Sequence, residues 1–154
     1  MPKKADEELK SVEEEQIIEL LQKDARMPVK KIAKKVGLSE STVKNRIQKL
    51  KKEGYIRDFA LLLNPKKFGK NIISILMIST GLSKTKECIQ MLKKFPQIIN
   101  IYFTTGEYSI IAMGLFDDDE DLNYFLVNKL SKIDIHQYNV VTVLEKIKES
   151  YFEI

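Results

Sequence analysis

The spacing of the apolar residues changes once along the chain. Up to Gly54 they recur three or four positions apart, which is the spacing of one face of a helix. After Asn71 they form continuous runs, which is typical of strands that are covered on both faces. A chain with both patterns predicts an α+β protein of two domains. We place these domains at 1–63 and 64–154, because Asn64-Pro65 is a turn signal.

Three helices are expected in the first domain. The first begins at Ser11, because Ser11-Val12-Glu13-Glu14 fits a capping box. Pro28 suits the first turn of the second helix, and Gly37 ends that helix in the left-handed conformation. Ser39 then caps a third helix over 40–53. Two helices joined by Gly-Leu-Ser, of which the second is the more basic, form the helix-turn-helix pattern.

From residue 55 onward the chain is expected to form mainly strands. Residues 55–63 are expected to be extended, either as the wing of a winged helix-turn-helix or as a β-linker, and 66–71 to be a polar loop. The second domain is expected to have strands at 72–80, 98–105, 108–116 and 136–144, and helices at 84–94 and 120–130. This βαββαβ order is that of the ferredoxin-like fold.

Two of the expected strands are apolar on both faces. In the first strand Ile73, Ile75 and Met77 alternate with Ile72, Leu76 and Ile78; in the third, Ile111, Met113 and Leu115 alternate with Ile110, Ala112 and Phe116. Both helices of a βαββαβ unit cover the same face of the sheet, so the other face needs a different cover. We therefore expect an isologous homodimer, which is also what a helix-turn-helix needs to bind two half-sites.

Positive charge is concentrated in the helix-turn-helix. Between Arg26 and Arg57 there are eleven Lys or Arg residues and two acidic ones, whereas the whole chain carries a net charge of +4. A local excess of this kind predicts a surface for a polyanion, here double-stranded DNA, although lysine-rich solvated helix faces also occur. The residue types that pair with base edges or hold phosphates lie in and just before the third helix. They are Ser39, Ser41, Thr42, Lys44, Asn45, Arg46, Gln48 and Lys49.

Other classes of protein fit the composition poorly. Cys88 and His136 are the only residues of their types, so we expect no metal site within one chain and no cofactor. No nucleophile, base and acid stand at a recognisable spacing, and we expect no catalytic residues. Residues 1–15 are mostly charged and the longest apolar run, 72–78, is too short to span a bilayer, so we expect a cytoplasmic protein.

The chain resembles the Lrp/AsnC family (leucine-responsive and asparagine regulators, the feast/famine proteins) of bacteria and archaea, from about Ser11 to Ile147. The matching residues are Ile17–Arg26, Ile32-Ala33, Val36–Ser39, Val43–Ile47, Leu50–Ile56, Asn64-Pro65 with Gly69, and Thr105-Gly106 with Tyr108. The resemblance implies a transcriptional regulator that forms dimers and larger assemblies, often octamers.

The resemblance also implies an effector site. The C-terminal domain of the family commonly binds an amino acid or a related metabolite near the Thr-Gly turn. Here that turn contains Thr105, Gly106, Glu107, Tyr108 and Ser109. The family pattern usually has Asp where this chain has Ser109, and a carboxylate is the natural partner of a ligand's ammonium group. Either Glu107 supplies the acid, or another subunit does, or the turn is a plain hairpin with no effector.

Two alternatives to a sensing regulator are open at this stage. Sirohaem decarboxylases resemble the same family across both domains, but their tetra-anionic substrate favours an Arg-rich or His-rich pocket. No Arg follows Arg57, and His136 is the single histidine, which weighs against an enzyme. An architectural DNA-binding protein without an effector is harder to exclude than the enzyme, because the sequence does not show regulation.

Overall fold

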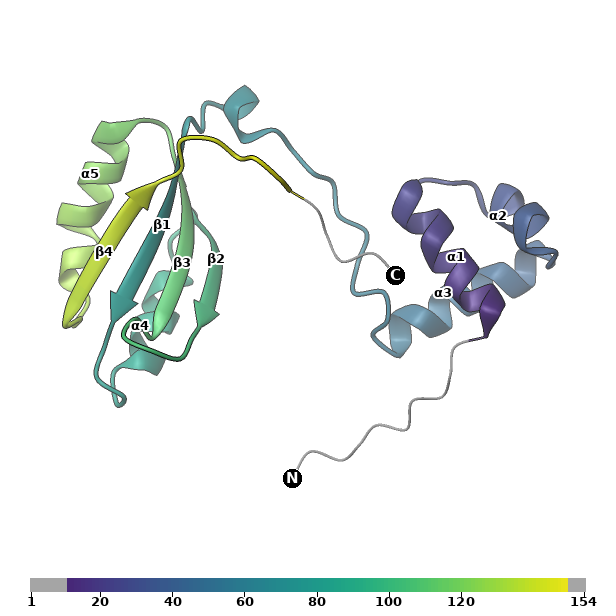
Figure 1. The fold of residues 1–154 in the computed structure, drawn as a ribbon, viewed down its shortest axis with the longest axis horizontal. Coiled ribbons are helices and arrows are strands. Elements are labelled where there is room, and N and C mark those ends of the chain that lie inside the picture. The colour runs from purple at the N-terminus through teal and green to yellow at the C-terminus, as the bar shows by residue number, and fades with distance from the viewer. Residues whose placement is uncertain (1–10, 150–154) are drawn as a thin grey trace. The chain divides into compact units, whose positions relative to one another are not determined.

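A computed structural model describes residues 11–149 of the chain (Figure 1). The chain divides into two compact units, and the division falls between Leu62 and Leu63. The charged start of the chain, on which the expected location partly rests, lies outside the described residues at 1–10, as do 150–154. No helix in the described part of the chain is long and apolar enough to cross a membrane.

The first unit contains helices α1 (Val12–Lys23), α2 (Val29–Val36) and α3 (Glu40–Lys52). The capping box at α1 is confirmed, because the Ser11 side chain accepts from the Glu14 backbone and the Glu14 side chain accepts from the Ser11 backbone. Gly37 has φ 71° and ends α2, as expected. Pro28 lies one position earlier than predicted, at the cap of α2 and not in its first turn.

The three helices enclose a small apolar core. One face of each helix supplies it, at the helical spacing read from the sequence. The buried members are Ile17, Ile18, Leu21, Ile32, Ala33, Val43 and Leu50. This core fixes α3 on its apolar side only, so the rest of its circumference is left for other contacts.

The expected strand at 55–63 is absent from the described structure, and so is a wing in the first unit. A strand needs a neighbouring segment to complete its ladder of hydrogen bonds, and the sheet of the second unit is made by other residues. The polar loop predicted at 66–71 is also corrected in part. A 3-10 helix, Pro65–Phe68, forms there, capped by Asn64 and ended by Gly69 at φ 79°.

The second unit has the predicted βαββαβ order. Its elements are β1 (Ile72–Ser79), α4 (Thr85–Leu92), β2 (Ile98–Phe103), β3 (Ile110–Phe116), α5 (Asp119–Asn128), a 3-10 turn (Leu130–Lys132) and β4 (Gln137–Thr142). The antiparallel sheet has the order β2-β3-β1-β4. Each of these strands and helices is one to three residues shorter in total than predicted, although α5 begins one residue earlier, at Asp119.

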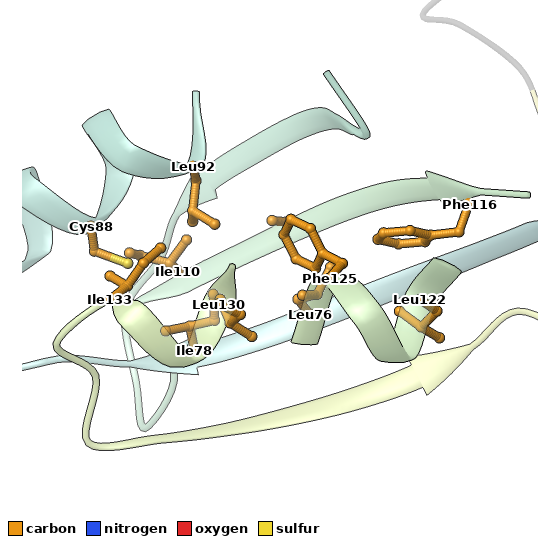
Figure 2. Packing of buried hydrophobic residues seen from close by; sticks show 11 residues of the cluster. Leu76, Ile78, Cys88, Leu92, Ile110, Phe116, Leu122, Phe125, Leu130 and Ile133 are labelled. Carbon is orange, nitrogen blue, oxygen red and sulfur yellow. The ribbon is translucent and has the colours of Figure 1, made fainter. Parts of the chain in front are cut away.

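One face of the sheet carries the core of this unit. Side chains from α4, α5, β1 and β3 meet in a single cluster, shown in Figure 2. Phe125 of α5 lies at its centre, with ring centroids 5.2 Å from Phe95 and 5.3 Å from Phe116. Both helices therefore cover the same face, as the fold class requires.

The other face of the two central strands has no helix over it. Burial alternates along β1 and β3, and the residues that face away from the helices are only half-buried. They are Ile73, Ile75, Met77, Ile111, Met113 and Leu115. The register places Ile75 directly opposite Met113, so these residues form one continuous apolar surface, which we call the open face.

Two buried hydroxyl groups in this unit differ in their bonding. Ser74 is fully buried in β1, and its Oγ has no hydrogen-bond partner. Thr85 is 5% exposed, but its Oγ1 lies 2.8 Å from Oγ1 of Thr80 and donates to the Gly81 carbonyl at 3.3 Å. A buried polar group without a partner destabilises the fold, whereas a bonded one contributes modestly to stability.

We expect Ser74→Ala to raise the free energy of unfolding by about 1 kcal/mol, because it removes an unpaired buried hydroxyl. Thr85→Val is the matched control and should lower it by about 1 kcal/mol, because it removes a bonded one. Urea unfolding followed by circular dichroism measures both. A loss of stability in Ser74→Ala as large as that in Thr85→Val would contradict this interpretation.

Candidate nucleic-acid interface and effector turn

The start of α3 is fixed by its own hydroxyl groups. The Oγ of Ser39 accepts from the Thr42 backbone N–H at 3.1 Å, so Ser39 is the cap predicted from the sequence. The same oxygen lies 2.7 Å from the Thr42 hydroxyl and 2.9 Å from the Ser41 hydroxyl. The first turn of α3 is therefore ordered before any ligand binds, with exposed hydroxyl groups at Ser39 and Ser41.

A polar stripe runs along the side of α3 that lies away from the core. Its members are exposed and recur every three or four positions: Ser41, Lys44, Asn45, Gln48 and Lys52. Lys44, Asn45 and Gln48 have no side-chain hydrogen bond or ion pair with the residues that the structure describes. We call these five residues the outward stripe. Amide side chains with both donor and acceptor groups free are suited to base edges.

The two remaining predicted residues, Arg46 and Lys49, face α1. Nη1 of Arg46 donates to Oγ of Ser11 at 2.7 Å and to Oε2 of Glu13 at 3.3 Å. Nζ of Lys49 lies 3.7 Å from Oε1 of Glu14. Hydrogen bonds from the Ser11 hydroxyl, from the Glu13 backbone N–H and from Arg46, in that order, lower the pKa of the Glu13 carboxyl.

Exposed cations are numerous on α2 and at the end of α3. Lys30, Lys31, Lys34 and Lys35 of α2 are all exposed, and so are Lys51 and Lys52 at the end of α3. The excess of positive charge noted in the sequence is therefore a surface property of the first unit. Such a surface attracts a polyanion in a salt-dependent way.

In the second unit the predicted effector residues lie in the turn between β2 and β3. The turn is closed by the Thr104 N–H, which donates to the Ser109 carbonyl at 2.8 Å, and by the Thr104 hydroxyl, which donates to the Tyr108 carbonyl at 2.6 Å. Gly106 has φ 105°, and no heavy atom lies within 4 Å of where its Cβ would be. Backbone that only glycine readily adopts is thus exposed at the tip.

The side chains of this turn are tied to neighbouring elements. Oγ of Ser109 lies 3.1 Å from Oγ1 of Thr80, so the residue in the place of the family's usual acid belongs to a chain of hydroxyl groups. Nε2 of Gln137, at the start of β4, donates to Oε1 of Glu107 at 2.9 Å. Thr105 is exposed, and Tyr108 is half-buried. The only carboxylate in the turn is therefore oriented by the Gln137 amide of β4, which β1 separates from β3.

The two halves of the chain match two known families. Residues 14–57 match the winged helix-turn-helix DNA-binding family, and residues 73–151 match the Lrp/AsnC ligand binding domain. The HTH-type transcriptional regulator FL11 of Pyrococcus furiosus is 35% identical over 137 residues, which cover 89% of this chain and 91% of that protein. The chain belongs to the Lrp/AsnC family.

A second relative agrees with this assignment, and solved structures have the same fold. The HTH-type transcriptional regulator LrpA of Pyrococcus horikoshii is 37% identical, over 86% of this chain and 94% of that protein. E. coli AsnC has the same fold, with a TM-score of 0.89 and 25% identity over 95% of this chain and 99% of that one. A regulator from Neisseria meningitidis in complex with L-Met has a TM-score of 0.85, with 21% identity over 92% and 94% of the two chains. The predicted family, α+β class and role as a transcriptional regulator are confirmed.

Several partners of the predicted residues were not found from the sequence. The sequence predicts only a capping box at Ser11, Glu13 and Glu14. Nothing in the spacing of these residues shows that α3 lies beside them. Thr80 and Gln137 lie about 30 residues from their partners in the turn. Contacts between elements distant in sequence depend on tertiary packing, which periodicity does not encode.

Proposed function

We propose that this protein binds double-stranded DNA sequence-specifically as a homodimer, with α3 in the major groove, and that a small ligand bound at the β2–β3 turn regulates it. The relatives named above are regulators of transcription, and no catalytic step is part of the proposal. The outward stripe is the single observation that carries the DNA-binding part.

The outward stripe has the chemistry and the shape for a major groove. Asn45 and Gln48 offer amide groups that pair bidentately with adenine edges, and Lys44 and Lys52 offer point charges for phosphates. The helix is capped and packed on its apolar side, so DNA meets a preformed surface. Little conformational entropy is then lost on binding.

The open face supports the homodimer. Six half-buried apolar side chains on two adjacent central strands form a patch that a soluble monomer rarely leaves in water. A second copy has the same patch, and a two-fold axis brings the two together as an isologous interface. A dimer also presents two copies of α3 to two half-sites.

The β2–β3 turn supports the effector site. Gly106 lets the backbone approach a ligand, and its amide with that of Glu107 suits a carboxylate. The Glu107 carboxylate suits the ammonium group of the same ligand, in place of the acid that Ser109 lacks. The N. meningitidis regulator, of the same fold, was crystallised with L-Met, which makes an amino acid the first class to test.

For DNA, we expect Asn45→Ala to cost about 1–3 kcal/mol of binding free energy at one base position and to relax preference there. Lys44→Ala is the matched control, because it should weaken binding to all sequences alike and reduce the salt slope by about 1. Selection from a random DNA pool followed by titration at several salt concentrations measures both. Unchanged DNA affinity and unchanged base preference in Asn45→Ala would contradict the proposal that the outward stripe contacts base edges.

For the dimer, we expect Ile75→Lys to give a folded monomer, because the two-fold axis places two buried charges in one apolar interface. Val127→Lys is the matched control: Val127 is 60% exposed on α5, away from the open face, so the dimer should persist. Light scattering of the full chain, with circular dichroism to verify folding, distinguishes the outcomes. A folded Ile75→Lys protein that remains dimeric would show that the interface lies elsewhere.

For the effector, we expect calorimetry with the twenty amino acids to detect a ligand whose binding is lost in Gly106→Ala. Gly69→Ala is the control, because Gly69 also has a positive φ and open space but lies outside the turn. We expect Ser109→Asp to strengthen the same binding, because it adds the missing acid. Binding that survives Gly106→Ala unchanged would place the site elsewhere, and no binding at all would leave the regulator without an amino-acid effector.

A further inference from the structure

Arg46 has the most versatile DNA-binding side chain of α3, and yet its guanidinium is directed at the start of α1. We propose that Arg46 is a positioning residue, which sets the angle between α3 and α1, and that it does not contact a base. This inference rests on the DNA-binding function proposed above and deepens it, because it removes Arg46 from the residues expected to contact bases and gives it a positioning role.

The guanidinium is held at two points. One nitrogen, Nη1, donates to the Ser11 hydroxyl at 2.7 Å and to the Glu13 carboxylate at 3.3 Å, and the side chain is only 26% exposed. Ser11 is itself fixed, because its hydroxyl accepts from the Glu14 backbone as the cap of α1. The planar guanidinium therefore binds acceptors that are already ordered, which makes the contact directional.

A second cation repeats the contact one turn further along α3. Lys49 lies three positions after Arg46, hence on the same side of the helix. Its ammonium is 3.7 Å from Glu14, whose side chain is 12% exposed and also closes the capping box. Two successive turns of α3 thus meet the acidic first turn of α1. The lowered pKa of Glu13 means that its pairing with Arg46 persists to lower pH than that of an ordinary Glu.

The apolar core by itself holds the rotation of α3 about its own axis only weakly, and a directional contact with α1 can fix it. Hydrophobic burial has no direction, and Val43 with Leu50 forms a narrow stripe about which α3 can roll. A small roll moves every member of the outward stripe relative to a groove. Hydrogen bonds from one flank of α3 to α1 oppose that roll, so they affect how well the stripe fits DNA without touching it.

A contacting and a positioning Arg46 predict opposite signs for Glu13→Gln. If Arg46 is to bind DNA, then Glu13 competes for it, and neutralising this acid should tighten binding and raise the positive charge of the surface. If Arg46 positions α3, the same substitution weakens its anchor and should weaken binding although the charge becomes more favourable.

The test uses full-length protein and a duplex selected by the wild type, at a temperature where circular dichroism shows every variant fully helical. At that temperature a variant that is merely less stable is still fully folded, so its affinity for DNA should equal that of the wild type. We expect Glu13→Gln to bind about fivefold more weakly, as for the loss of part of one charge-assisted hydrogen bond. Tighter or unchanged binding by Glu13→Gln would overturn the proposal.

Arg46→Ala gives a second, independent readout. We expect it to weaken binding to every sequence by a similar factor, with the base preference and the salt slope of the wild type. Arg46→Lys should bind more tightly than Arg46→Ala but more weakly than the wild type, because one ammonium can donate to both acceptors but stands on a shorter side chain. Loss of preference at one base pair, or a salt slope lowered by about 1, would make Arg46 a DNA contact. If neither Arg46 variant folds, the sign of the Glu13→Gln effect decides alone.

Discussion

The two central strands of the second unit are apolar on both faces, and much of the rest of the molecule depends on covering them. Within the chain, α4 and α5 cover one face, where Phe116 and Phe125 form the centre of the core. The helices cannot also cover the opposite face, because a βαββαβ connection places both on the same side. In the proposed homodimer a second copy covers the open face, and the pair then carries two copies of α3.

The helix-turn-helix holds α3 in place with a small apolar core and a few polar contacts. Its core is seven buried residues, which fix α3 along one narrow side only. Three further contacts of α3 are polar: the Ser39 cap at its start, and those of Arg46 and Lys49 with α1 along its flank. A helix that contacts base edges, as proposed for α3, must be oriented more exactly than apolar burial alone allows. We propose that hydrogen bonds to the capped start of α1 fix this orientation.

In the turn between β2 and β3, the polar side chains of Ser109 and Glu107 bond to residues of other elements. Ser109 stands where the family usually has an acid, and its hydroxyl joins Thr80 and Thr85 in a chain of hydrogen bonds. Glu107, two residues earlier, is oriented by Gln137 of β4, a strand that β1 separates from β3. The carboxylate of this turn is therefore supplied by Glu107 and not by position 109.

The sequence by itself determined the helices, the βαββαβ order, the Ser11 and Ser39 caps and the family, because these follow from local periodicity, capping chemistry and short motifs. It failed at 55–63, where an extended pattern has no neighbouring segment and forms no strand in the described structure. Only the tertiary structure separated Arg46 and Lys49 from the outward stripe and joined Glu107 to Gln137. Such contacts link elements distant along the chain, and their geometry depends on how the helices and strands pack, which no local pattern records.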